Sequence, residues 1–264
     1  MFEFHTDRER YFEMQWLNAR EYVLPFVESV FPVRPGMRVL EIGCGEGGVM
    51  KAFLERGCAG VGVELDASRV KLAQRLLADQ LADGSIRLVS KDIYQVDVQS
   101  DLQGPFDIIL LKDVIEHIHD QPRLIGWMKQ FLKPGGCIFF GFPPWHMPFG
   151  GHQQICRSRL SRLPYIHLLP RFVYRGLLRW KNEPVDDLME IRDTRISIER
   201  FERICLQQGY RFLSSEHFLF NPIYKWKFGW KPRKQFSWIR SIPVLRNYLT
   251  TCVYYLITPN NQPI

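Results

Sequence analysis

The stretch Val39-Leu40-Glu41-Ile42-Gly43-Cys44-Gly45-Glu46-Gly47-Gly48 decides the fold, because an apolar strand ends abruptly in a run of glycines. Glycine permits a tight strand-to-helix turn and leaves no Cβ to obstruct a nucleoside or amino-acid group. The helix that follows presents free N–H groups to such a ligand. Glu41 would repel a pyrophosphate and suits a cationic, amino-bearing ligand. The spacing also lacks the last, more distant glycine of the dinucleotide fingerprint.

The pattern acid-x-Gly-x-Gly-x-Gly after an apolar strand resembles the first motif of the class I S-adenosylmethionine-dependent methyltransferases. Within that family, the group closest in pattern contains the ubiquinone-biosynthesis O-methyltransferases and other small-molecule methyltransferases. The resemblance covers roughly residues 35 to 145 and implies S-adenosylmethionine as the cofactor. It implies that five residues of the first motif bind this cofactor: Glu41, Gly43, Cys44, Gly45 and Gly47.

Later motifs follow in the family's order. Gly60–Asp66 is a second apolar strand that ends in an acid, about 20 residues past the glycines, where a ribose-binding acid is expected. Glu64 would then bind the ribose hydroxyls and Leu65 would lie against the adenine face. After the third strand, Asp92 and Ile93 resemble the motif at the adenine edge. Residues 105–111 and 132–140 indicate the fourth and fifth strands.

Length and composition favour one large α/β domain. The 264 residues are 46% hydrophobic and can bury a full core. The six scattered cysteines are typical of reduced core thiols in a cytoplasmic protein. The N-terminus shows no apolar leader, and no apolar run reaches the roughly 18 residues that span a bilayer. We expect a single methyltransferase domain over 1–264, divided into a helical cap (1–34), a cofactor-binding core (35–145), a substrate-side insertion (146–193) and a C-terminal part (194–264).

The predicted architecture is a doubly wound, seven-stranded, mostly parallel sheet, a Rossmann-like methyltransferase fold with insertions after strands five and six. Hydrophobic periodicity predicts helices over 9–30, 47–56 and 67–82, and a capped helix from Ser197 to Gly209. Strands near 211–220 and 248–258 would complete the sheet, the last inserted antiparallel. The helix over 9–30 covers the sheet, and in related enzymes this segment also closes over the cofactor.

Charge is distributed unevenly along the chain. Residues 1–140 carry 16 Lys and Arg against 20 Asp and Glu, whereas residues 141–264 carry 19 against 8. The insertion 221–247 interleaves bases with aromatic residues, which suits the headgroup level of an anionic membrane. The same composition also binds single-stranded RNA, or simply caps the sheet. Peripheral contact through 224–240 with an anionic membrane, at its inner surface, is therefore one expectation, and nucleic acid is the weaker one.

Methyl transfer needs alignment, exclusion of water and, for a hydroxyl or amine acceptor, removal of a proton. His117 follows the fourth strand, and His146 and His152 lie in the loop after the fifth, so we take these three as candidate catalytic residues. Asp113, Glu116 and His117 resemble the Glu-x-x-Glu-His segment of the ubiquinone-biosynthesis enzymes, in which such groups can hold a divalent cation. The same residues also suit a metal-free helix start, and our main expectation is that no metal is bound.

The sequence thus predicts an S-adenosylmethionine-dependent methyltransferase that acts on an oxygen of a small or lipid-like acceptor. N-methylation and RNA methylation are alternatives within the class. A non-catalytic nucleoside-binding module and an NAD-dependent dehydrogenase are alternatives outside it. The identity of the acceptor and the oligomeric state do not follow from these residues.

Overall fold

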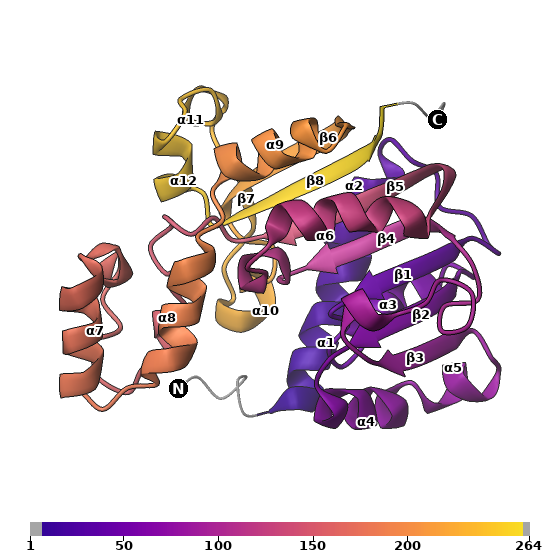
Figure 1. Ribbon diagram of the computed structural model, residues 1–264, viewed down its shortest axis with the longest axis horizontal. Coiled ribbons are helices and arrows are strands. Elements are labelled where there is room, and N and C mark those ends of the chain that lie inside the picture. Colours follow the sequence, from indigo (N-terminus) through magenta and orange to yellow (C-terminus); the bar gives the residue numbers. More distant parts are fainter. Residues whose placement is uncertain (1–6, 261–264) are drawn as a thin grey trace.

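The computed structural model describes residues 7–260, whose strands form one eight-stranded sheet with helices on both faces (Figure 1). The strand order is β3-β2-β1-β4-β5-β8-β6-β7. The first five strands are parallel: β1 (Arg38–Ile42), β2 (Ala59–Glu64), β3 (Ile86–Ser90), β4 (Phe106–Lys112) and β5 (Leu132–Phe142). The direction of winding reverses between β1 and β4, and ligands of such sheets bind at the carboxyl ends of the strands beside this point.

The predicted doubly wound sheet and its antiparallel last strand are confirmed. β8 (Cys252–Pro259) lies between β5 and β6 (Tyr210–Phe220) and is antiparallel to both. The count of seven strands was one short, because β7 (Arg233–Lys234) adds a two-residue edge strand to β6. The strand expected over 248–258 begins only at Cys252, since α12 (Leu245–Leu249) occupies the residues before it.

Alternate residues of the strands enter two apolar cores, one on each face of the sheet. Leu40 and Ile42 point to the face covered by α6 (Gln121–Trp127) and α9 (Ile198–Gln207). Val39 points to the face covered by α1 (Arg8–Asn18), α2 (Leu24–Glu28) and α3 (Gly48–Leu54). All six cysteines are buried.

Helix starts follow the capping residues of the sequence. Asp7, Asp66 and Ser197 each accept a hydrogen bond from a backbone N–H in the first turn of α1, α4 (Ala67–Leu76) and α9. The helix predicted over 9–30 is α1, a π-helical stretch (Ala19–Val23) and α2 in succession. The helix predicted over 67–82 is divided at Leu77 into α4 and α5 (Ala78–Ala82).

The insertion after β5 folds on a small core of its own. It contains α7 (Arg171–Trp180) and α8 (Val185–Thr194), which project from the sheet in Figure 1. Five buried residues form the core: Cys156, Tyr174, Leu178, Leu188 and Met189.

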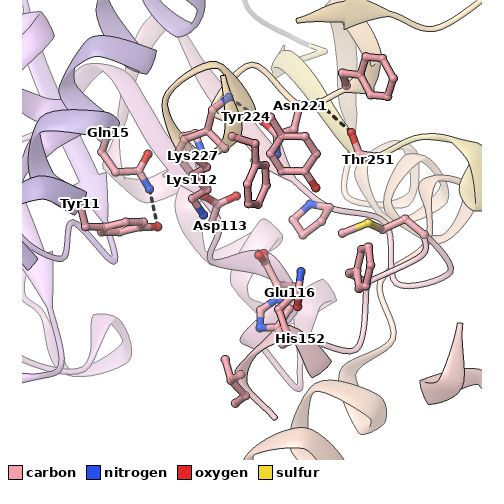
Figure 2. Close-up of a pocket in the computed structure, with 18 of the residues that line it drawn as sticks. Tyr11, Gln15, Lys112, Asp113, Glu116, His152, Asn221, Tyr224, Lys227 and Thr251 are labelled. Atoms are coloured by element: carbon pink, nitrogen blue, oxygen red, sulfur yellow. Dashed lines mark hydrogen bonds and ion pairs between the residues drawn. The ribbon is translucent and has the colours of Figure 1, made fainter. Parts of the chain in front are cut away.

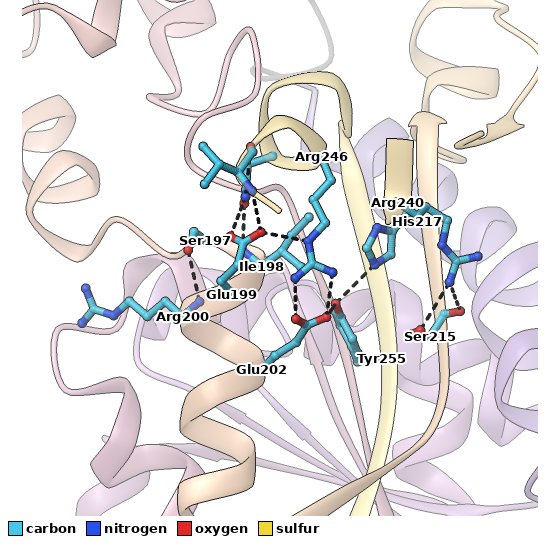
Figure 3. A network of polar contacts seen from close by, with 12 residues as sticks. Ser197, Ile198, Glu199, Arg200, Glu202, Ser215, His217, Arg240, Arg246 and Tyr255 are labelled. Carbon is cyan, nitrogen blue, oxygen red and sulfur yellow. Dashed lines mark hydrogen bonds and ion pairs between the residues drawn. The ribbon is translucent and has the colours of Figure 1, made fainter. Parts of the chain in front are cut away.

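The insertion after β6 is tied to the sheet by a polar network. It contains α10 (Tyr224–Phe228), β7, α11 (Ser237–Arg240) and α12. Figure 3 shows Arg246 of α12 paired with Glu199 and Glu202 of α9. The hydroxyl of Tyr255 on β8 donates to Glu202 over 2.7 Å. These charge-assisted bonds fix the insertion against α9, so that α10 faces the carboxyl ends of the strands.

Candidate functional site

A cavity of about 840 Å³ opens at the carboxyl ends of β1, β4 and β5, and Figure 2 shows the residues at its centre. One end is formed by the glycine loop after β1 and by α1. The other end is formed by the loop after β5 and by the two insertions. The residues at the first end are Tyr11, Gln15, Glu41, Gly43, Cys44, Glu46 and Arg69.

The glycine loop adopts a backbone that only glycine holds without strain. Gly43 and Gly47 have φ of +68° and +85°. A Cβ at Gly43 would lie 2.6 Å from Cγ2 of Val114, and one at Gly47 would lie 2.5 Å from Cδ1 of Leu77. These glycines therefore let the loop lie close against its neighbours, and the N–H groups of Gly43 and Cys44 donate to the carbonyl oxygen of Val63 over 2.8 and 3.1 Å.

Glu41 is buried beneath this loop. Its Oε2 accepts a hydrogen bond from the N–H of Met50 in α3 over 2.9 Å. Burial raises the pKa of Glu41 to about 8, and the hydrogen bond from Met50 lowers it only in part. A buried carboxyl group of this kind becomes ionised readily when a cation is placed beside it.

Glu64 links the glycine loop to the end of β2. Its Oε2 accepts from the N–H of Gly45 over 2.8 Å, and its Oε1 accepts from the N–H of Asp66 over 3.0 Å. Leu65 beside it is 72% exposed, which leaves its side chain available to a flat ligand. Glu64 and Leu65 lie outside the cavity, at the neighbouring strand end.

Asp92 and Ile93 stand at the next strand end. Asp92 accepts from the N–H of Tyr94 over 2.9 Å and caps the short 3₁₀ helix Ile93–Gln95, and Ile93 is buried. Because β2 pairs with β3, these residues adjoin Glu64 and Leu65. The four residues form a continuous rim with the glycine loop.

Two arginines hold Glu46 of the loop. Arg69 of α4 donates from Nε and Nη2 over 3.1 and 2.9 Å, and Arg8 of α1 donates over 2.9 Å. Burial raises the pKa of Glu46, whereas the hydrogen bonds and the charge of Arg69 lower it. Together the arginines have the larger effect, so the pKa of Glu46 lies below its usual value. The guanidinium group of Arg69 also lies directly over Gly45. Arg8 and Arg69, through their shared contact with Glu46, therefore join α1 and α4 across the loop.

A charged pair separates the two ends of the cavity. Lys112 at the end of β4 donates to Oδ2 of Asp113 over 2.6 Å, and Asp113 has a φ of +56° that turns it into the cavity. The amine of Lys112 holds the pKa of Asp113 below its usual value despite burial. Lys227 of α10 faces the same carboxylate, and burial lowers the pKa of Lys227 to about 8. Burial and the charge of Asp113 raise the pKa of Tyr11 to about 12.

Glu116, His117 and His152 meet on the side of this pair away from the glycine loop. One ligating atom of each lies within 4.8 Å of the others, and the two imidazole rings are 5.2 Å apart between centroids. Both carboxylate oxygens of Glu116 are buried without a hydrogen-bond partner among the described residues. Burial raises the pKa of Glu116 well above its usual value. Burial also lowers the pKa of His117, and that of His152 to about 3.

His146 and Asp113 are placed differently from the other candidates. The ring of His146 packs against Trp145 and Tyr248 at centroid distances of 4.9 and 5.3 Å, and it does not line the cavity. Asp113 lies outside the Glu116, His117 and His152 group because it pairs with Lys112. The group therefore includes a residue from the loop after β5 in place of Asp113.

A family model for the methyltransferase domain matches residues 16–167, more than half of the chain. The chain belongs to this methyltransferase family. The ubiquinone biosynthesis O-methyltransferase of Leptothrix cholodnii is 27% identical over 116 residues, which are 44% of this chain and 48% of the relative. The enzyme of the same name from Idiomarina loihiensis is 34% identical over 118 residues, 44% of this chain and 46% of the relative. The matched part spans about half the length of these curated relatives.

Solved structures share the fold. A geranyl diphosphate methyltransferase in complex with S-adenosylmethionine has a TM-score of 0.54 and 15% identity, covering 89% of this chain and 82% of the other. Phosphoethanolamine N-methyltransferase 2 of Haemonchus contortus has a TM-score of 0.56 and 17% identity, and the match covers 89% of this chain and 51% of the other. These likenesses show a shared fold over about nine tenths of this chain.

Sequence reasoning missed four residues that face the centre of this methyltransferase cavity: Tyr11, Gln15, Tyr224 and Lys227 (Figure 2). Gln15 donates to the hydroxyl of Tyr11 over 2.7 Å and fixes it beside Asp113. Tyr11 carried a usable signal, since it lies on the helix expected to close over a cofactor. Lys227 carried none, because its basic-aromatic surroundings pointed to an exposed loop.

Proposed function

We propose that the protein transfers a methyl group from S-adenosylmethionine to an oxygen atom of a small or lipid-like acceptor. The observation that carries this proposal is one continuous cavity, which joins the glycine loop to a chamber containing His117 and His152. Both relatives described above are named as O-methyltransferases, which supports an oxygen acceptor.

The residues at the glycine end fit an aminoacyl nucleoside. Glu64 and Asp92 stand at successive strand ends and suit the ribose hydroxyls and the adenine amine, with Leu65 against the ring. Glu41 and Asp113 line the cavity, and their acidic groups suit a ligand's ammonium group. When bound, the sulfonium of this cofactor supplies an already activated methyl group. The chain then has to align the acceptor, exclude water and remove a proton.

His117 and His152 are suited to take that proton. Burial lowers both pKa values and keeps the imidazoles neutral near pH 7, so each can accept a hydrogen bond from a hydroxyl. The negative charge of Asp113 raises the pKa of both rings and so opposes the loss of basicity that burial causes. Apolar residues surround the rest of the chamber and exclude water. They are Phe149, Ile155, Leu219, Phe220, Phe228, Trp230 and Leu249. A wall of this kind suits an acceptor with an apolar body.

The same group suits a divalent cation as a second candidate. One carboxylate and two imidazoles are donors for zinc, manganese or iron, and the unpartnered oxygens of Glu116 favour this option. A cation here would lower the pKa of a bound acceptor hydroxyl. Treatment with a chelator tests it: lost activity that returns with metal supports the cation, and full activity rejects it.

Contact with an anionic membrane through 224–240 is supported only by the outer part of this segment. Lys225 pairs with Glu21, Trp226 packs against Tyr22, and the side chains of Tyr224 and Lys227 face the cavity. Lys231 and Trp238 are exposed. We therefore propose that Lys231 and Trp238 contact an anionic membrane. Binding to anionic vesicles tests this: it should weaken with salt and when Lys231 and Trp238 are replaced. None of the helices within residues 7–260 is both long and apolar enough to span a bilayer.

Isothermal titration with S-adenosylmethionine, S-adenosylhomocysteine and NAD tests the proposal. We expect binding of both sulfur ligands and none of NAD. Tight NAD binding without a response to the sulfur ligands would instead support a dehydrogenase. Binding of the sulfur ligands without transfer to any phenol, alcohol or amine tested would point to a non-catalytic nucleoside-binding module. Transfer to an amine or to RNA in preference to hydroxyls would change the acceptor.

A further inference from the structure

Helix α7 (Arg171–Trp180) carries two parallel rows of exposed side chains outside the cavity. Arg171, Arg175 and Arg179 recur every fourth residue and form one row. Phe172, Gly176 and Trp180 recur in the same way and form the row beside it. Phe172 is 77% exposed and Trp180 is 70% exposed, so most of both rings lies in solvent.

The inner side of α7 already accounts for its packing. Tyr174 and Leu178 are fully buried against Leu188 and Met189 of α8. Figure 1 shows α7 at the outer edge of the molecule, with α8 between it and the sheet. The fold of the insertion therefore does not require the outer rows, and aromatic residues on such a face call for another explanation.

The charge around α7 is strongly basic. The sequence has no Asp or Glu between Asp120 and Glu183, and residues 157–181 contain seven Lys and Arg. Within residues 7–260, the acidic partners observed for this segment lie in α8 or just before it. Asp193 pairs with Arg171, and Glu183 accepts from the N–H groups of Arg157 and Ser158.

The remaining acids of α8 leave two arginines of α7 without an ion pair. Glu190 lies 3.5 Å from His119, and Asp186 and Asp187 are exposed at the start of α8. Within residues 7–260, Arg175 and Arg179 form no ion pair. Two guanidinium groups of the basic row are therefore available to an outside anion.

We propose that α7 is a docking helix that lies on the surface of an anionic bilayer. The row of Phe172 and Trp180 would enter the headgroup region, where amphipathic rings are favoured, and the arginine row would bind lipid phosphates. A lipid surface satisfies both rows at once along the length of the helix. No residue of α7 lines the cavity described above or a second, smaller one, whereas single-stranded RNA is bound in basic grooves with stacking platforms.

The segment that leads into α7 also forms part of the cavity wall. Arg162 and Tyr165 line the cavity and belong to the segment that leads into α7. Leu160 and Leu163 of the same segment are 40% and 47% exposed. An acceptor could therefore pass from the bilayer along this segment to His117 and His152. That last step rests on the proposed function, whereas docking of α7 does not.

Co-sedimentation with phosphatidylcholine vesicles, with and without phosphatidylglycerol, tests the docking helix. We expect binding that requires phosphatidylglycerol and weakens with salt. Arg175→Glu/Arg179→Glu should weaken it by roughly 25-fold or more, because each base at an anionic surface contributes about fivefold in affinity. Phe172→Ser/Trp180→Ser should also weaken it at least tenfold, through loss of the buried rings.

Matched variants away from α7 serve as controls. Arg87→Glu/Arg203→Glu changes the net charge by the same amount on β3 and α9, and Leu206→Ser removes an apolar residue that is 59% exposed on α9. Both should bind vesicles as the unchanged protein does. Thermal unfolding and titration with S-adenosylhomocysteine should be unaltered in all four variants.

Several outcomes overturn the docking helix. One is that the protein binds vesicles equally well with and without phosphatidylglycerol, and another is that the control variants lose as much vesicle binding as the α7 variants. Binding of single-stranded RNA without binding of vesicles would overturn it as well. A dimer in size-exclusion chromatography that Phe172→Ser/Trp180→Ser dissociates would assign the face to a second copy of the chain. Failure of S-adenosylhomocysteine to bind the unchanged protein would refute the proposed function and leave vesicle binding by α7 intact.

Discussion

Glu41 combines a stability cost with a proposed role in binding. Its pKa in the folded protein is raised from about 4.5 to about 8 by burial, so the folded protein retains a proton that the unfolded chain has lost. The stability linked to this group is fully present below pH 4.5 and is lost as the pH rises through 8. Glu41→Gln keeps the size of the side chain and the acceptor for Met50 but does not titrate.

We therefore expect the melting temperature of the unchanged protein to fall more steeply between about pH 5 and 9 than that of Glu41→Gln. The variant should also bind S-adenosylmethionine at least tenfold more weakly, because a neutral amide does not pair with an ammonium group. Glu28→Gln, on the surface near Arg56, is the control and should follow the unchanged protein. Parallel pH profiles for Glu41→Gln and the unchanged protein would contradict the assignment.

The histidines provide a comparison at the same scale. His117→Asn and His152→Asn should each lower kcat by about 10²- to 10⁴-fold, the usual contribution of a proton acceptor, with the cofactor affinity unchanged. His146→Asn should change kcat less than about threefold, because its ring packs outside the cavity. Steady-state kinetics with the identified acceptor and calorimetry with S-adenosylhomocysteine measure the two quantities. Equal losses in all three variants would mean that the loop, and not the imidazoles, matters.

Among the elements, the contact between α1 and α3 sets the position of the cavity's first wall. A Cβ at Gly48 would lie 2.5 Å from the carbonyl oxygen of Phe12 and 2.8 Å from Cβ of Gln15. Gly48→Ala should therefore push α1 away from α3, lower the free energy of unfolding by about 1–3 kcal/mol and weaken cofactor binding. At Gly176 in α7, an added Cβ would meet no atom within 4 Å, so Gly176→Ala should raise the free energy of unfolding by about 0.5–1 kcal/mol. Denaturant unfolding measures both, and a neutral Gly48→Ala would mean that the helices can separate freely.

Elements with strong local signals were predicted well. Ser197 and Gly209 bracket α9, and the alternating or continuous apolar runs mark the parallel strands. The start of β8 was misplaced because Tyr248 and Leu249 have strand-like character, yet α12 is held by the tertiary pairing of Arg246 with α9. Tertiary contacts override local propensity at such positions.

For the whole molecule, the grouping of the residues proposed to bind the cofactor could be predicted, and that of the residues proposed to bind the acceptor only in part. The predicted cofactor residues come from three consecutive strand ends, so their order in the sequence matches their order in the sheet. The centre of the cavity and the proposed acceptor chamber join Tyr11, Glu116, His152 and Lys227 from four distant segments. No short sequence pattern predicts that four such distant segments lie together. His117 and His152 were each singled out, but their contact required the path of the insertion after β5.

The stability of the whole fold should report cofactor binding. Ligand at 100 times its Kd stabilises a folded protein by about 2.7 kcal/mol, which corresponds to a rise of roughly 5–10 °C in melting temperature for a chain of this size. Glu64→Ala removes the acceptor of the Gly45 and Asp66 N–H groups, so S-adenosylhomocysteine should shift this variant by less than about 2 °C. Asp79→Ala on exposed α5 should shift as the unchanged protein does. An equal shift with NAD, or a full shift in Glu64→Ala, would place the ligand elsewhere than at the ends of β1 and β2.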